Sequence, residues 1–212
     1  MNLADLRREY TKGGLRRAEL DLNPLVQFQK WFEQALNSQL LEPSAMTLAT
    51  ADRQGQPSAR IVLLKAVDER GFVFFTNYQS RKGRELADNP RAALTLYWAE
   101  LERQVCITGE VTKVPRAESE KYFAMRPRGS QLGAQVSKQS SVVPDRAFLE
   151  VRLSEVEKQF ADRPVETPPH WGGYVLAPRT IEFWQGRPNR LHDRLQYSKQ
   201  ADDSWRIERL SP

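Results

Sequence analysis

The feature that most constrains the fold is a run of short β-prone segments separated by tight turns. These segments are rich in β-branched and aromatic residues and span 45–50, 59–67, 72–76, 92–98 and 105–114. Turn-forming residues at 52–57 and 68–71 separate the first three segments. Parallel strands need crossover connections of about a dozen residues or more, and these connections are shorter than that. The sequence therefore predicts a mainly antiparallel sheet.

Helical periodicity occurs on both sides of this block. Asn23 can cap a helix that Pro24 begins, and we expect the helix to end near Glu42 and Pro43, because a residue before proline avoids helical dihedral angles. Its apolar stripe comprises Leu25, Phe28, Phe32, Ala35 and Leu36. Further helices are expected from Ser80 to about residues 89–90, over 116–137 and over 145–161.

Strand-like segments return towards the C-terminus, over 173–177, 180–185, 190–197 and 205–210. Strands early and late, with helices between them, predict an α+β fold built around a small barrel. No linker separates the blocks, so residues 23–212 are expected to form a single domain. The strongly charged residues 1–22 are expected to form a mobile basic arm.

The charge balance and the scarcity of soft ligands narrow the possible partners. The chain has 32 Lys and Arg against 27 Asp and Glu, and this net charge of +5 favours nucleic acid, anionic lipid or phosphorylated small molecules. Cys106 is the single cysteine, and His170 and His192 are the only histidines, so neither a disulfide framework nor a typical zinc or copper site is expected. No stretch has the length of a membrane span, and the first residues lack the apolar core of a secretory signal. We therefore expect a cytoplasmic protein with no membrane partner and no metal.

The common phosphate-binding and hydrolase motifs are missing from the sequence. It contains no GxGxxG after a strand and no GxxxxGK[ST], which argues against dinucleotide-fold and P-loop proteins. It also contains no HExxH and no GxSxG. Any anion site must therefore be built from scattered cations.

Two cationic clusters belong to the β-rich block. Arg60 and Lys65 bound a strand whose interior is aliphatic, and strand parity places them on opposite faces, so they are either ordinary strand-end cations or contacts to an anion. Arg81 and Lys82 follow the cap Ser80 at a helix N-terminus, an end that repels cations. A bound phosphate would offset this repulsion, and the alternative is a solvated helix start.

A third cluster is Tyr122, Arg126 and Ser130. A spacing of four places Tyr122 and Arg126 on one helical face, although Pro127 interrupts the helix or starts a new one. Two hydroxyl groups and a guanidinium suit a phosphate. A polar helix face without a ligand is equally compatible with this pattern.

The fourth cluster is Arg190, His192 and Arg194. Period-two geometry places all three on one face of a strand and turns Leu191 and Leu195 towards the core. Two guanidinium groups beside an imidazole repel one another without a counter-anion. The pattern is therefore about equally compatible with a ligand-facing role and with a purely structural histidine.

Taken together, these stretches resemble the pyridoxamine/pyridoxine 5′-phosphate oxidase family of FMN enzymes. The resemblance runs through several ordered segments, which makes it more specific than one short motif. They are Leu6-Arg7-Arg8-Glu9-Tyr10-Thr11-Lys12-Gly13-Gly14-Leu15, Arg60-Ile61-Val62-Leu63-Leu64-Lys65, Ser80-Arg81-Lys82-Gly83, Glu102-Arg103-Gln104-Val105, Tyr122-Phe123 with Arg126-Pro127-Arg128 and Ser130-Gln131, Val136-Ser137-Lys138-Gln139-Ser140-Ser141, Ile181-Glu182-Phe183-Trp184-Gln185-Gly186 and Arg190-Leu191-His192-Asp193-Arg194.

The resemblance implies an FMN-binding split β-barrel and a homodimer with active sites at the subunit interface. It implies FMN contacts from Arg60, Ile61, Val62, Leu63, Leu64, Lys65, Phe75, Thr76, Arg81, Lys82, Gln104, Gln139, Ser140, Trp184 and Arg194. It implies substrate contacts from Arg7, Tyr10, Lys65, Tyr122, Arg126, Ser130, Arg190 and His192, with Arg190 and His192 also catalytic. Phe75 stands where tyrosine is common in the family, and Trp98-Ala99 and Cys106 also depart from the commoner residues.

The implied reaction oxidises pyridoxamine 5′-phosphate or pyridoxine 5′-phosphate to pyridoxal 5′-phosphate. A hydride leaves C4′ of the substrate for N5 of FMN, and O2 reoxidises the flavin to give H2O2. Three rival interpretations remain: another split-barrel flavoprotein such as a flavin reductase, a non-catalytic carrier of pyridoxal 5′-phosphate, and a basic nucleic-acid-binding protein. The phosphate-binding clusters favour the oxidase and predict no nucleic-acid partner.

Overall fold

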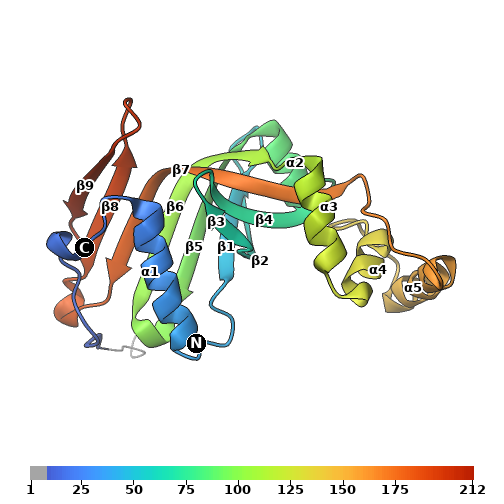
Figure 1. The fold of residues 1–212 in the computed structure, drawn as a ribbon, viewed down its shortest axis with the longest axis horizontal. Helices are drawn as coiled ribbons and strands as arrows, with labels where there is room; N and C mark the ends of the chain where they lie inside the picture. Colours follow the sequence, from blue (N-terminus) through green and yellow to red (C-terminus); the bar gives the residue numbers. More distant parts are fainter. Residues whose placement is uncertain (1–8) are drawn as a thin grey trace.

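The computed structural model describes residues 9–212, and within them nine strands form one antiparallel sheet (Figure 1). The strand order is β2-β1-β5-β6-β7-β4-β3, and β8 and β9 continue from β7. The strands are β1 (Ala45–Ala51), β2 (Pro57–Leu63), β3 (Ala66–Asp68), β4 (Gly71–Asn77), β5 (Arg91–Trp98), β6 (Arg103–Lys113), β7 (Trp171–Gln185), β8 (Asp193–Lys199) and β9 (Trp205–Leu210). The predicted antiparallel arrangement is confirmed.

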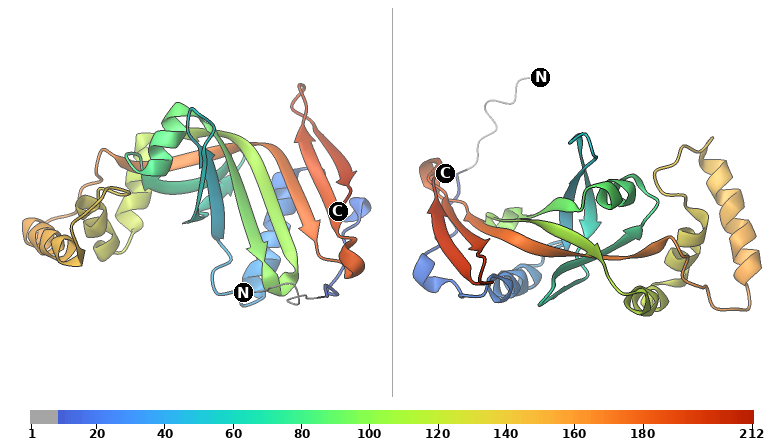
Figure 2. Two further views of the ribbon diagram at one scale, coloured as in Figure 1. Left: turned by 180° about the vertical axis from the view of Figure 1, so that it is seen from behind. Right: turned by 90° about the horizontal axis from the view of Figure 1, so that it is seen from above.

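Strand β7 changes partners along its length, and this divides the sheet. Its first half pairs with β4, its second half pairs with β8, and β6 follows it along the other edge. A register shift at Thr108/Gly109 lies opposite Pro178, and a Cβ on Gly109 would lie 2.0 Å from the Ala177 carbonyl oxygen. This bulge lets one strand continue where the sequence predicts two, over 173–177 and 180–185. Figure 2 shows the curled half-barrel that results.

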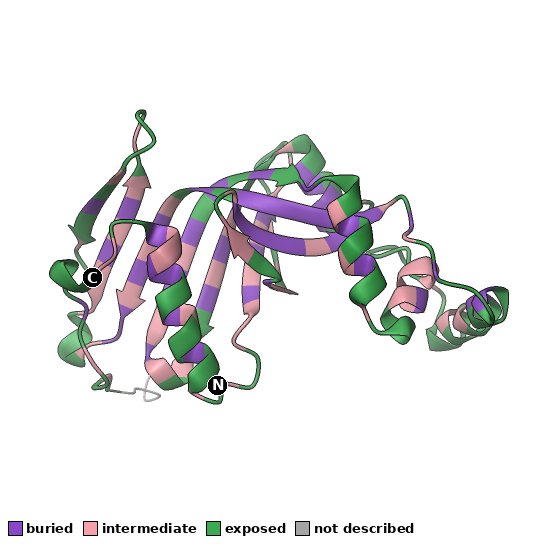
Figure 3. Ribbon diagram, in the orientation of Figure 1, coloured by how far each residue is buried: buried purple, intermediate pink, exposed green. Residues whose placement is uncertain are grey.

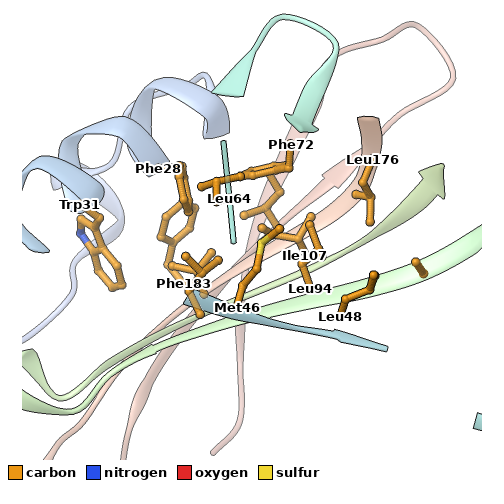
Figure 4. Packing of buried hydrophobic residues seen from close by; sticks show 14 of the residues in the cluster. Phe28, Trp31, Met46, Leu48, Leu64, Phe72, Leu94, Ile107, Leu176 and Phe183 are labelled. Carbon is orange, nitrogen blue, oxygen red and sulfur yellow. The ribbon is translucent and has the colours of Figure 1, made fainter. Parts of the chain in front are cut away.

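Helix α1 (Pro24–Asn37) covers one face of the curled sheet. The Asn23 side chain caps it by accepting from the Leu25 N–H at 2.9 Å. Phe28 packs edge-on against Phe72 with ring centroids 4.9 Å apart, and Trp31 packs against Phe183 at 5.1 Å (Figure 4). Figure 3 shows the buried residues that line the strands beneath this helix. Such aromatic pairs supply much of the core's contact area.

The end of α1 differs from the prediction. The helix ends at Asn37, with Ser38 as its C-cap, rather than near Glu42 and Pro43. Leu36, placed in the apolar stripe by its spacing, is 54% exposed. The segment between Ser38 and β1 leaves the helix early because it must turn back to begin the sheet.

The remaining helices are α2 (Arg81–Asp88), α3 (Arg116–Met125), α4 (Arg128–Val136) and α5 (Arg146–Phe160), with 3₁₀ turns at Arg17–Glu19, Ala99–Leu101 and Pro188–Arg190. The single helix expected over 116–137 is two helices, because Arg126 is extended ahead of Pro127. Helix α3 packs against the first residues of β7, and α4 and α5 lie beyond that end of the strand, away from β8 and β9 (Figures 1 and 2). No helix within residues 9–212 is long and apolar enough to cross a membrane.

Two other predicted strands have different bounds. The segment 59–67 divides into β2 and β3 at Leu64 and Lys65, because the chain there exchanges β1 for β4 as its partner. The segment 190–197 becomes β8 only from Asp193, because residues 188–190 form a 3₁₀ turn. Both differences bear directly on the candidate site.

Candidate functional site

A cavity of about 660 Å³ lies among β4, α3 and α4, beside the strand break after β2. Its wall contains a large share of the residues that the resemblance singles out: Ile61, Val62, Leu63, Lys65, Phe75, Thr76, Lys82, Tyr122, Arg126, Ser130 and Gln139. Lys65 lines this wall together with Ile61 and Leu63, whereas Arg60 does not, so the two cations lie on different sides as strand parity predicts, although β2 ends at Leu63.

One end of this cavity is built on the N-terminus of α2. Ser80 caps the helix by accepting from the Gly83 N–H at 3.3 Å, and Gly83 is required there because a Cβ would lie 2.1 Å from the Tyr78 carbonyl oxygen. Lys82 is 8% exposed and donates to Gln139 Oε1 at 2.8 Å and to Thr76 Oγ1 at 3.3 Å. Burial, and then the charge of Arg60, lowers the pKa of Lys82 to about 8, while Glu85 opposes the shift.

A buried carboxylate, Glu85, organises the neighbouring arginines. It accepts from Thr50 at 2.5 Å and Ser58 at 2.6 Å, and it pairs with Arg60 at 3.3 Å and Arg81 at 2.8 Å. Burial alone would raise the pKa of Glu85, but these hydrogen bonds and the Arg60 charge outweigh it and lower the pKa to about 2. One carboxylate thus faces three cations, Arg60, Arg81 and the nearby Lys82, and an excess of positive charge remains at this end. The spacing of four from Arg81 was the sequence signal for this residue, which our sequence interpretation missed.

The other end of the cavity holds Arg126 against aromatic rings. Its guanidinium carbon lies 4.7 Å from the Trp171 ring centroid and 5.4 Å from that of Phe123. Phe75 stacks on Tyr122, with centroids 4.1 Å apart. Arg126 adopts an extended conformation after α3, so it reaches the cavity from the interhelical corner and not from the helical face that its spacing predicted.

The Arg126 guanidinium has spare hydrogen-bonding capacity. Within residues 9–212, its NH1 is the one buried side-chain nitrogen or oxygen atom without a hydrogen-bond partner. Burial lowers the pKa of Arg126 and the nearby Tyr122 opposes this shift. A buried unpaired donor on a cation is costly, so an anionic ligand at this end would satisfy it.

The remaining predicted residues gather elsewhere. Gln104, Trp184, His192 and Arg194, together with Cys106 and Glu182, line a second pocket of about 230 Å³. The His192 and Trp184 rings lie 4.7 Å apart, and Tyr10 meets them edge-on at 5.7 and 5.6 Å. The His192 Nδ1 atom accepts from the Arg187 N–H at 3.1 Å.

The strand-face interpretation of the fourth cluster is wrong. Arg190 and His192 precede β8, and Arg190 has a positive φ of 60°, so period-two geometry does not relate them to Arg194. Leu191 is 69% exposed and does not enter the core, whereas Leu195 is fully buried. Arg194 already has a counter-anion, because it pairs with both carboxylate oxygens of Glu182 at 2.8 and 2.9 Å.

Some predicted residues stand apart from both pockets. Arg60 and Arg81 do not line the cavity and belong to the Glu85 network. Leu64 is buried in the core, and Ser140 is exposed with a φ of 69° beside Gln139. Arg7 lies outside the described residues, as do residues 1–8 of the predicted arm. The mobility expected for 1–22 stays a prediction.

The two groups lie at opposite ends of β7. Trp171, the first residue of β7, lines the large cavity, and Trp184, its penultimate residue, lines the small pocket. At about 3.3 Å per residue, the strand separates them by on the order of 40 Å. The two pockets share no lining residue. Within one chain, therefore, Arg190 and His192 do not meet Tyr122, Arg126 and Ser130.

Comparisons with known proteins cover the whole chain. The profile of the family described as pyridoxamine 5′-phosphate oxidase matches residues 32–160, and that of the pyridoxine 5′-phosphate oxidase C-terminal dimerisation region matches 171–212. A relative from Burkholderia thailandensis named pyridoxine/pyridoxamine 5′-phosphate oxidase is 60% identical over 212 residues, covering 99% of each chain. A relative of the same name from Cyanothece sp. is 58% identical over 212 residues, covering 100% of this chain and 99% of that protein.

Solved structures agree on the fold. PhzG from Burkholderia lata, in complex with tetrahydrophenazine-1-carboxylic acid, has a TM-score of 0.88 and 32% identity, covering 93% of this chain and 98% of that chain. An FMN-binding protein from Nostoc punctiforme related to pyridoxamine 5′-phosphate oxidase has a TM-score of 0.70 and 18% identity, covering 87% and 97%. These likenesses confirm the predicted split barrel with peripheral helices.

Proposed function

Because this chain belongs to the pyridoxamine 5′-phosphate oxidase family, we propose that it converts pyridoxamine and pyridoxine 5′-phosphates to pyridoxal 5′-phosphate with FMN as its cofactor. One observation carries the proposal. The large cavity has two cationic ends, one at Lys82 and one at Arg126, and each lacks sufficient negative charge. Two phosphates, one on the cofactor and one on the substrate, would supply it.

The residues present at the α2 end fit the phosphate of FMN. Lys82, Arg60 and Arg81 outnumber Glu85, and the N-terminus of α2 adds its own partial positive charge. The residues from Ile61 to Lys65, with Phe75, Thr76, Gln139 and Ser140, would hold the rest of the cofactor. Gln104, Trp184 and Arg194 would complete the site from a second subunit. FMN held there would supply the redox chemistry, as the acceptor of a hydride from substrate C4′ with O2 as the final electron acceptor.

The residues at the Arg126 end fit the substrate phosphate. Lys65 and Arg126 supply charge, and Tyr122 and Ser130 supply hydroxyl groups on the same wall. Arg190 and His192 would lie over the substrate ring, orient it, and carry the proton from the substituent on C4′. Tyr10 and Arg7 would close the site from the N-terminal arm.

The proposal requires two copies of the chain. The phosphate-binding residues and the Arg190–His192 pair lie at opposite ends of β7, so one chain cannot assemble a complete site. The match of residues 171–212 to a dimerisation region supports a homodimer in which each subunit completes the other's site. Both active sites would then lie at the subunit interface.

An anaerobic titration tests this function. Pyridoxine 5′-phosphate should bleach the flavin absorbance of the purified protein, and admitting air should restore it with formation of H2O2. Arg190→Met and His192→Asn should reduce turnover while FMN stays bound. If neither pyridoxine 5′-phosphate nor pyridoxamine 5′-phosphate bleached the flavin, the result would contradict the oxidase function. It would favour a carrier of pyridoxal 5′-phosphate or another split-barrel flavoprotein. A protein that holds no flavin but binds DNA or RNA in a salt-dependent manner would favour the nucleic-acid alternative.

A further inference from the structure

We propose that Glu102 and Asp193 are positioning residues that fasten residues 11–15 to the sheet and thereby hold Tyr10 against Trp184 and His192. The carboxylate of Glu102 accepts from the Thr11 N–H at 2.8 Å and from the Lys12 N–H at 2.9 Å. The carboxylate of Asp193 accepts from the Leu15 N–H at 3.0 Å. We call residues 11–15 the strap. The inference rests on the proposed function only where it concerns catalysis.

Glu102 is placed where it can control the position of Tyr10. It is 2% exposed and has a left-handed backbone, with φ 54° and ψ 39°. Its carbonyl oxygen accepts from the Gly186 N–H at 2.8 Å and from Gln185 Nε2 at 3.2 Å. One residue thus binds the strap through its side chain and the end of β7 through its backbone.

Tyr10 packs directly on the segment that Glu102 holds. A Cβ built on Gly186 would lie 2.6 Å from Tyr10 Cγ, so the ring lies against bare backbone and a larger residue would displace it. The ring also meets Trp184 and His192 edge-on, at centroid distances of 5.6 and 5.7 Å. Its position therefore depends on the distance between the strap and residues 184–186.

Asp193 fastens the other end of the strap. Arg209 donates to Asp193 Oδ1 at 2.6 Å and to the Leu15 carbonyl oxygen at 3.1 Å. The Asp193 carboxylate, the Arg209 guanidinium and the Leu15 backbone are therefore joined in a ring of hydrogen bonds. Leu15 is 5% exposed and belongs to the main core. Asp193 directly follows His192 in the sequence, so the strap is tied to the same segment that carries the proposed catalytic residue.

Charged acceptors make these attachments strong. A hydrogen bond from a backbone N–H to a carboxylate is shorter and stronger than one to a neutral acceptor. The strap belongs to no strand, so without these carboxylates the amides of Thr11, Lys12 and Leu15 would be left to water. Removal of Glu102 should therefore release Thr11 and Lys12 locally and leave the sheet intact.

The test is hydrogen exchange on the FMN-loaded protein, with three variants. In Glu102→Ala, exchange of the amides of Thr11 and Lys12 should quicken roughly tenfold or more, and Glu102→Gln should give an intermediate rate because one neutral acceptor remains. Asp193→Asn should speed exchange at Leu15. Glu157→Ala, an exposed carboxylate on α5, is the control and should leave all of these rates unchanged.

Kinetics separate a positioning role from a structural one. If Glu102 acts through Tyr10, then Glu102→Ala and Tyr10→Ala should each lower kcat/KM, and the double variant should be no worse than Tyr10→Ala. Additive losses would overturn the positioning role. Unchanged exchange at Thr11 and Lys12 in both Glu102 variants would overturn the attachment itself. Because exchange is measured without turnover, a protein that fails to oxidise pyridoxine 5′-phosphate would contradict the proposed function and leave the attachment intact.

Discussion

Lys82 on α2 donates to Gln139 Oε1 at 2.8 Å, which joins the helix to the segment after α4 across the candidate site. The same oxygen accepts from Thr76 Oγ1 at 3.1 Å, so neutral oxygens surround a buried ammonium group. With a pKa of about 8, Lys82 loses its charge well below the pH at which an exposed lysine does. The charge of this residue is therefore sensitive to what binds beside it.

The first prediction concerns FMN affinity and pH. A bound phosphate stabilises the ammonium and raises the pKa of Lys82 above its value of about 8 in the free protein. Below that value Lys82 is charged with and without ligand, so affinity stays constant. Above it binding must take up a proton, so affinity should fall by up to about tenfold per pH unit. Quenching of flavin fluorescence measured from about pH 7 to about pH 9.5 gives the profile.

Lys82→Arg is the matched control, because arginine stays protonated across this range. Its affinity should change little with pH, whatever its absolute value. A wild-type profile that is flat, or one that falls in parallel with the variant, would show that Lys82 does not bind the FMN phosphate.

The second prediction concerns the carboxylate between the arginines. The pKa of Glu85 is about 2 in the folded protein against 4.5 for an exposed glutamate, so the stability it contributes is present above about pH 4.5 and is lost as the pH falls towards 2. Glu85→Gln should lower the free energy of unfolding at neutral pH by roughly 1.5–3 kcal/mol. The difference from wild type should shrink in acid. Urea unfolding at several pH values measures it.

Glu110→Gln supplies the comparison, because Glu110 forms an exposed ion pair with Arg179 at 3.4 Å. Exposed pairs contribute about 0–1 kcal/mol, so this variant should be close to wild type at every pH. If Glu85→Gln also left the free energy of unfolding unchanged, the hydrogen bonds and ion pairs of Glu85 would not stabilise the fold.

The third prediction separates stability from substrate binding at Arg126. Because its NH1 is buried and unpaired, Arg126→Met should leave the substrate-free protein as stable as wild type or up to about 1 kcal/mol more stable. The same change should raise KM for pyridoxine 5′-phosphate by tenfold or more, with FMN affinity unchanged. Thermal unfolding and steady-state kinetics on one preparation test both parts.

Arg128→Met is the neighbouring control. Arg128 donates to the Phe160 carbonyl oxygen at 2.6 Å and does not line the cavity. This variant should lose stability and keep its KM, which is the opposite pattern. If Arg126→Met lost stability and kept its KM, the proposed phosphate contact would be wrong.

Local sequence patterns predicted the sheet well, because strand propensity and short turns are properties of neighbouring residues. They failed where a strand's bounds depend on its partners. The division at Leu64 and Lys65 follows from the exchange of β1 for β4, and the continuity of β7 through Pro178 follows from a bulge at Gly109 on another strand. The residues of the divided segment do not by themselves indicate the division, and the residues of β7 do not indicate its continuity.

The candidate site shows the same limit. Cation clusters and the family resemblance named the residues of the large cavity, but spacing misplaced Arg126 and Arg190, because Arg126 follows the end of α3 and Arg190 lies in the 3₁₀ turn before β8. The spacing of four from Arg81 indicates an ion pair for Glu85, but the burial of this carboxylate among hydroxyl groups follows only when Thr50, Ser58 and Arg60 are brought together. The separation of the two groups along β7 was likewise invisible in the sequence.

That separation leads to the last prediction, which uses two variants that should have little activity at a pyridoxine 5′-phosphate concentration far below the KM of Arg126→Met. Arg126→Met damages the large cavity, and His192→Asn damages the small pocket at the other end of β7. If each site combines the cavity of one subunit with the pocket of its partner, a mixed dimer contains one doubly damaged site and one intact site.

Refolding the two variants together in equal amounts makes half of the dimers mixed, so turnover should recover to about a quarter of wild type. Mixing Arg126→Met with Lys65→Met should restore nothing, because both changes lie in the same cavity and every site then carries one of them. Steady-state oxidation of pyridoxine 5′-phosphate by the separate and mixed preparations decides the matter. Equal, negligible turnover in both mixtures would show that the two groups of residues do not form a shared site, and the dimeric assembly proposed from β7 would have to be abandoned.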